Sequence, residues 1–106
     1  MIARTLGGLA VAAALAFPAA AGPQATVIKI ANFTFQHEVT VPVGATVTWT
    51  NDDDIPHTIV AVDKSFRSKV LDTGESYSFT FTAAGSFAYF CSIHPQMTGK
   101  VIVKPS

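Results

Sequence analysis

The chain has 106 residues, with seven Lys or Arg and seven Asp or Glu, so its formal net charge is zero. This balance excludes the basic surface that nucleic-acid binding requires, and we expect no nucleic-acid partner. The length is that of one small domain, and the first segment of the chain raises the overall apolar share.

The first 21 residues are predicted to be a cleavable signal peptide. Arg4 supplies the positive start, residues 6–17 are apolar or Gly, and residues 19–21 are small residues that a signal peptidase accepts. The apolar run is too short to span a bilayer core of about 30 Å, which needs roughly 20 apolar residues. We therefore expect export to the periplasm, no membrane insertion of the mature protein, and a single domain over residues 22–106. An uncleaved N-terminal anchor is the alternative.

Short segments of alternating apolar and polar residues follow one another through the rest of the chain. In the clearest one, Tyr77, Phe79 and Phe81 alternate with Ser and Thr. Such strands at short spacing predict an all-β Greek-key sandwich or barrel of about seven or eight strands. Residues 64–71 have only a weak pattern and are expected to be loop or irregular strand. The expected strands cover residues 25–31, 38–43, 45–50, 56–62, 76–82, 86–91 and 99–104.

Asp52, Asp53 and Asp54 follow the third of these expected strands. We interpret them as a polar, solvated turn, which is the usual role of such residues between strands. A calcium site is disfavoured because three adjacent carboxylates in a turn cannot all converge on one ion.

Cys91, His94 and Met97 form a compact run near the end of the chain, with two residues between each pair. Thiolate, imidazole and thioether are soft metal ligands, and His57 supplies a second imidazole from an earlier segment. A trigonal arrangement of two His and one Cys with a weak axial Met is the ligand set of blue-copper electron-transfer sites. A structural zinc site is the alternative, although zinc favours a closed tetrahedron of Cys, His and carboxylate ligands. A metal-free interaction domain is a further alternative.

Two observations on Cys91 support a metal ligand. It is the single cysteine of the chain, so it forms no internal disulfide. It shares strand parity with Phe87 and Tyr89, so its sulfur is expected to point inward if these aromatic side chains face the core. The third histidine, His37, has no partner at metal-ligand spacing, and we assign it no role.

Two segments resemble the cupredoxins, the type 1 blue copper proteins. They are V-T-W-T-N-x5-H at residues 47–57 and Y-F-C-S-I-H-P-Q-M-T-G-K-V-I-V at residues 89–103. The two-and-two spacing of the ligand run is most similar to the amicyanin-like subgroup, within a similarity that extends over residues 25–104.

The resemblance implies one copper ion per chain, with His57, Cys91 and His94 as equatorial ligands and Met97 as a long axial ligand. It implies an electron carrier rather than an enzyme. A copper-delivery protein with the same ligands is the alternative function.

The resemblance also implies roles for two neighbours of the ligands. Asn51 matches a position whose side chain braces the ligand loops. Thr58 stands where the family usually has Asn; its backbone N–H is expected to donate to the Cys91 sulfur, with a shorter side-chain brace.

Redox proteins are the partners that the resemblance implies, with a quinoprotein dehydrogenase as electron donor and a c-type cytochrome as acceptor. Docking is expected around His94, over Pro56, Ile93 and Pro95. The mature protein is expected to be a soluble monomer.

Overall fold

The computed structural model describes residues 25–105, and the predicted signal peptide lies outside this range. Within it the chain forms eight β-strands and no helix, so the predicted all-β class is confirmed. The described residues include no helix with the length and apolar character needed to cross a membrane. The strands are β1 (Ala25–Ala31), β2 (Thr34–Phe35), β3 (Val39–Pro42), β4 (Thr46–Asn51), β5 (Val60–Ala61), β6 (Ser76–Thr80), β7 (Gly85–Phe90) and β8 (Thr98–Lys104).

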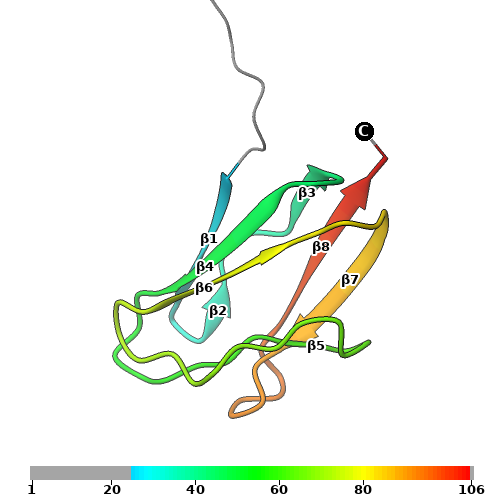
Figure 1. The fold of residues 1–106 in the computed structure, drawn as a ribbon. Helices are drawn as coiled ribbons and strands as arrows, with labels where there is room; N and C mark the ends of the chain where they lie inside the picture. Colours follow the sequence, from blue (N-terminus) through cyan, green and yellow to red (C-terminus); the bar gives the residue numbers. More distant parts are fainter. Residues whose placement is uncertain (1–24, 106) are drawn as a thin grey trace, which may run out of the picture.

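The strands form two four-stranded sheets that face each other as a sandwich (Figure 1). One sheet has the order β2-β1-β4-β6 and the other has the order β3-β8-β7-β5. From β2 to β7 the chain changes sheet at every strand, so consecutive strands are not paired with each other. The sandwich therefore depends on pairings between segments that are distant in the sequence. Two of these pairings are parallel, β1 with β4 and β3 with β8, and the others are antiparallel.

Two differences from the predicted strands have physical reasons. The segment 56–62 is mostly loop, and only its end forms β5, because His57 makes an isolated bridge with Leu71 instead of joining a ladder. The strand β2 is unforeseen because two residues are too short to show an alternating pattern. Residues 64–71 contain no regular strand, as expected.

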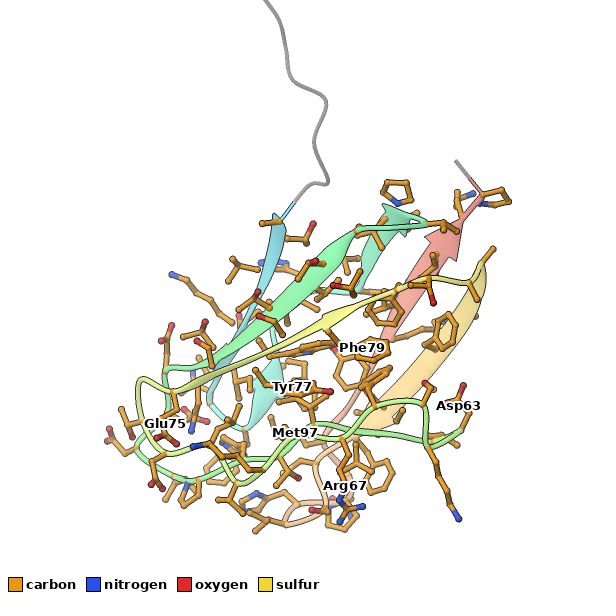
Figure 2. The ribbon with its side chains drawn as sticks, viewed as in Figure 1. Asp63, Arg67, Glu75, Tyr77, Phe79 and Met97 are labelled. Carbon is orange, nitrogen blue, oxygen red and sulfur yellow. The ribbon has the colours of Figure 1, made fainter. Side chains whose placement is uncertain are left out.

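Aromatic side chains fill the space between the sheets. Trp49 is fully buried, and its ring lies 5.7 Å from Phe66 and 5.3 Å from Tyr89. The expected core residues of β6 are present, and Figure 2 shows Tyr77 and Phe79 directed toward the interior. Phe66, from the segment with no clear pattern, is 4% exposed and lies among these rings. Each aromatic residue of this size contributes on the order of 2–3 kcal/mol through burial, so this cluster holds the two sheets together.

The outer face of β4 and β6 carries a row of hydroxyl groups. The cross-strand pairs are Thr46 with Thr80, Thr48 with Ser78, and Thr50 with Ser76, at 2.7–2.9 Å. Alternation therefore places apolar side chains in the core and hydroxyls in solvent along the same strands. This face stabilises the strand that ends at Asn51, where the metal-binding end of the sandwich begins.

Candidate metal centre

Cys91 directly follows β7 and is completely buried. The inward direction that strand parity predicts is therefore confirmed. Its N–H donates to the carbonyl of Met97 at 3.0 Å, and the N–H of Met97 donates to the carbonyl of His94 at 2.9 Å. These two bonds close a short loop between β7 and β8, which presents the whole Cys91 to Met97 run at one end of the sandwich.

His57 reaches the same end from the loop after β4. Its N–H and carbonyl both pair with Leu71, at 3.1 and 2.8 Å, which fixes its backbone. Its ring is fully buried. The position of His57 is therefore set by contacts between two loops and not by a strand of its own.

Asn51 joins the loops around His57. Its side-chain amide donates to the carbonyls of Ile55 and Leu71, both at 2.9 Å, and its side-chain oxygen accepts the N–H of Asp53 at 2.9 Å. Asn51 is fully buried and its bond to Leu71 is buried, whereas the bonds with Ile55 and Asp53 are partly buried. The brace that the family resemblance implied for this residue is present.

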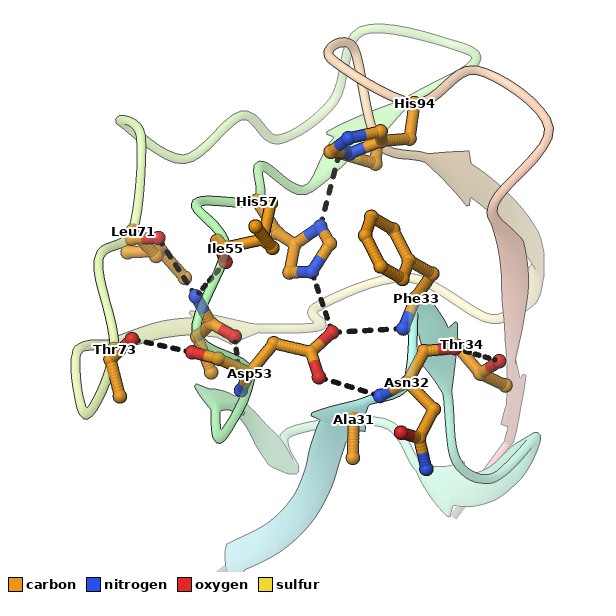
Figure 3. A network of polar contacts seen from close by, with 12 residues as sticks. Ala31, Asn32, Phe33, Thr34, Asp53, Ile55, His57, Leu71, Thr73 and His94 are labelled. Atoms are coloured by element: carbon orange, nitrogen blue, oxygen red, sulfur yellow. Dashed lines mark hydrogen bonds and ion pairs between the residues drawn. The ribbon is translucent and has the colours of Figure 1, made fainter.

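Asp53 was predicted to be part of a solvated turn, and this prediction is wrong because its carboxylate faces His57. Its Oδ2 lies 2.8 Å from Nε2 of His57, and its two oxygens accept the N–H groups of Asn32 and Phe33 at 2.6 and 2.8 Å (Figure 3). Burial opposes ionisation of Asp53, but the bonds from Phe33, His57 and Asn32 lower its pKa below the ordinary value. The ionised carboxylate accepts the Nε2 proton of His57, and this leaves Nδ1 free to bind a metal.

Three donor atoms converge at this end. The Cys91 sulfur lies 3.8 Å from Nδ1 of His57 and 3.8 Å from Nδ1 of His94, and the three atoms all lie within 4.8 Å of one another. A metal with bonds of about 2.0–2.3 Å to nitrogen and sulfur holds its ligand atoms roughly 3.5–4.0 Å apart. The three side chains therefore fit a single ion. Among the described residues, this is the one group of His, Cys and acidic side chains with such geometry.

The remaining predicted ligand, Met97, is buried within the core cluster at 6% exposure. Figure 2 shows it at the end of the sandwich to which the ligand loop belongs. His37 is exposed and lies outside the donor group.

The Cys91 thiol is prepared for metal binding. Burial raises its pKa, but the hydrogen bond from the Thr58 N–H and the close contacts of the sulfur with the His57 and His94 rings outweigh burial and lower the pKa to about 6. A thiolate is the form that ligates metals, so the protein favours the ligating form near neutral pH.

Thr58 links the two ligand loops more closely than its short side chain suggested. Its N–H donates to the Cys91 sulfur at 3.4 Å, as expected. Its hydroxyl also lies 2.8 Å from the Ser92 hydroxyl and accepts the Ser92 N–H at 2.8 Å. The threonine thus braces the loop through Ser92.

Comparison with known proteins identifies this arrangement. Residues 24–104 match the family model described as copper binding proteins of the plastocyanin/azurin family. The chain belongs to this family. It is therefore a cupredoxin that uses copper and carries electrons, and it is not an enzyme.

The curated relatives include amicyanins and plastocyanins. Amicyanin-alpha from Methylorubrum extorquens is 39% identical over 85 residues, which cover 74% of this chain and 71% of the relative. Amicyanin from Paracoccus versutus is 40% identical over 63% of this chain, but the match spans only 54% of that relative. The chloroplastic plastocyanin of Tetradesmus obliquus is 40% identical over 62% of the chain and 54% of the relative.

Solved structures show the same fold. An oxidized proline-to-alanine variant of amicyanin superposes with a TM-score of 0.72 at 37% identity, and the match covers 76% of this cupredoxin and 82% of the variant. A purple cupredoxin from Nitrosopumilus maritimus has a TM-score of 0.67 at 33% identity, covering 74% and 99% of the two chains. The predicted resemblance to amicyanin-like cupredoxins is confirmed.

Exposed apolar residues flank both histidine ligands in the chain. Ile93 is 45% exposed and Pro95 is exposed on either side of His94, and Ile55, at 38% exposure, and the exposed Pro56 precede His57. Residues 93–96 line a shallow hollow at this surface. Ile55 directly precedes Pro56 and was not among the residues predicted for docking.

Proposed function

We propose that this cupredoxin is a soluble periplasmic one-electron carrier whose single copper ion is held by His57, Cys91, His94 and Met97. The observation that carries the proposal is the convergence of three donor atoms: the Nδ1 atoms of His57 and His94 each lie 3.8 Å from the Cys91 sulfur, and all three lie within 4.8 Å of one another. The buried Met97 belongs to the same short loop, so its thioether is available as the weak axial ligand.

Bound copper would supply a one-electron couple between Cu(I) and Cu(II). The residues of the chain provide a fixed setting for both states, because the sulfur ligands suit Cu(I) and the imidazoles suit Cu(II). Hydrogen bonds from neighbouring loops hold the backbone and ring of His57 and the sulfur of Cys91, and hydrogen bonds within the ligand loop hold the backbone of Met97. Ligands that keep the same positions in both oxidation states keep the barrier to electron transfer low.

His94 is the proposed route by which electrons leave. Its ring is half-buried, whereas His57 and Cys91 are completely buried. We propose that the exposed apolar residues Ile55, Pro56, Ile93 and Pro95 form the docking surface around this route. A small apolar interface suits a partner that must dissociate after each transfer. A quinoprotein dehydrogenase as donor and a c-type cytochrome as acceptor are the proposed partner classes, with the carrier acting as a monomer.

The decisive experiment is reconstitution of the purified mature protein with Cu(II). We expect an intense visible thiolate-to-copper band that bleaches on reduction and returns on oxidation, and we expect its loss in Cys91→Ser. A protein that binds copper without this band would contradict the proposed site. Fractionation of expressing cells, with N-terminal sequencing of the exported form, tests the periplasmic location and the predicted end of the signal peptide at Ala21.

Copper delivery is distinguished by exchange kinetics. A carrier should keep its copper when a Cu(I) chelator is added, whereas a delivery protein should release it readily. Reversible redox cycling together with slow release supports the carrier, and rapid release supports delivery.

A further inference from the structure

Phe33 lies in an unusual conformation in the turn between β1 and β2. Its φ is 58° and that of the preceding Asn32 is 55°. Asn tolerates this left-handed region, but a bulky residue such as Phe adopts it at a cost of about 1–2 kcal/mol. The side chain is 50% exposed, so core burial does not fully repay this cost.

The Asp53 carboxylate holds the turn in this conformation. Two successive left-handed residues direct their N–H groups to one side, and here both donate to Asp53. The oxygen that accepts from Phe33 also lies 2.8 Å from Nε2 of His57. One carboxylate therefore fixes Phe33 and a metal-ligating imidazole relative to each other.

The aromatic ring of Phe33 contacts both imidazoles. Its centroid lies 5.0 Å from that of His94 and 5.5 Å from that of His57, in both cases with ring planes at 87° (Figure 3). The two histidines come from separate loops, and their own rings are 5.2 Å apart. Phe33 thus packs against both imidazole ligands from a third loop.

We propose that Phe33 is a positioning residue of the metal centre, an aromatic wall that Asp53 holds against His57 and His94. The wall restricts motion of the two imidazoles and shields the ion from small external ligands. Copper consequently leaves slowly, which is a property that a carrier needs. This inference rests on the ligand set of the proposed function.

The variant Phe33→Gly separates this role from a purely structural one. Glycine adopts positive φ freely, so a simple turn residue would be replaced without loss of stability. If Phe33 is a positioning residue, its removal should instead change the properties of the copper site. We expect transfer of copper from the reduced protein to a Cu(I) chelator to become about tenfold faster, as for loss of other outer-shell groups. We also expect added azide to alter the visible spectrum of the oxidised variant and not that of the parent.

Matched variants complete the test. Phe33→Tyr keeps the aromatic ring, so this variant should release copper as slowly as the parent protein. Val27→Ala shortens an apolar side chain of similar exposure, 51%, on β1 and should change neither measurement. Asp53→Asn should accelerate release, whereas Asp54→Asn removes the same charge from a neighbouring exposed residue and should not.

The outcomes are separable from those of the proposed function. If the parent protein forms the blue-copper band and folded Phe33→Gly has parental release kinetics and no azide response, the inference about Phe33 is overturned alone. Faster release with an azide response supports it. If Phe33→Gly does not fold, which circular dichroism reports, Phe33→Leu provides the same comparison: parental behaviour there overturns the proposal, and accelerated release supports it.

Discussion

Replacing Asn51 with alanine should destabilise the protein strongly even though Asn51 ligates no metal. The substitution removes three hydrogen bonds of a fully buried side chain: a buried bond to the carbonyl of Leu71, and partly buried bonds to the carbonyl of Ile55 and from the N–H of Asp53. At about 1 kcal/mol net for each bond, the expected loss in the free energy of unfolding is about 3 kcal/mol. For a domain of this size that corresponds to a fall in melting temperature of roughly 12–24 °C.

Urea denaturation of the copper-free protein, followed by circular dichroism, measures this loss without a contribution from metal binding. Thr50→Ala is the matched control, because it removes one hydroxyl pair with Ser76 from the exposed face of the same strand. We expect that control to cost less than about 0.5 kcal/mol, as is usual for surface substitutions. A loss below about 1 kcal/mol for Asn51→Ala would refute the reasoning, because it would mean that water replaces the three bonds.

Three further predictions follow from the same region. Thr58→Val keeps the shape of the side chain and the N–H bond to the Cys91 sulfur. It removes both bonds of the hydroxyl to Ser92 and its longer contact with the Cys91 sulfur at 3.7 Å, so chemical denaturation should show a loss of about 1–2 kcal/mol. A loss equal to that of a surface substitution would contradict the brace. Gly99→Ala would drive a methyl carbon into the buried Tyr89 ring, so thermal unfolding should show a loss of about 3 kcal/mol. The control Gly74→Ala meets no atom within 4 Å and should cost about 1 kcal/mol for its positive φ alone; equal losses would mean that Tyr89 moves aside. In the copper-free protein the Cys91 pKa of about 6 lies below the ordinary value of 9.0, so thiolate stabilisation is fully present above pH 9 and is lost as the pH falls through 6. The ultraviolet absorbance of the thiolate should titrate near pH 6 and be absent in Cys91→Ser, and a midpoint near 9 would show that the hydrogen bonds do not favour the thiolate.

The strand pattern and the ligand run could be predicted from the sequence because both are local. Alternation in residues 76–82 follows from the direction of successive side chains along a strand, and β6 does span Ser76–Thr80. Cys91 and His94 lie close in the chain, so their chemistry and spacing were sufficient to suggest a metal. His57 was reached through the motif that precedes it.

The bonds that hold the centre could not be predicted in the same way. Asp53 looked like one of three equivalent carboxylates, and only the fold places it between His57 and a turn 20 residues earlier. Phe66 belongs to a segment without a strand pattern and still lies against Trp49. Such contacts join residues whose separation in sequence carries no periodic signal.

The all-β class and the soft donor atoms of this cupredoxin can be read from its sequence, because strand periodicity and ligand chemistry are properties of neighbouring residues. Three features follow only from the folded chain: both Nδ1 atoms lie 3.8 Å from the Cys91 sulfur, Asp53 orients His57, and Phe33 packs against both imidazoles. These features depend on how three loops pack at one end of the sandwich, and loop packing is set by contacts between distant residues.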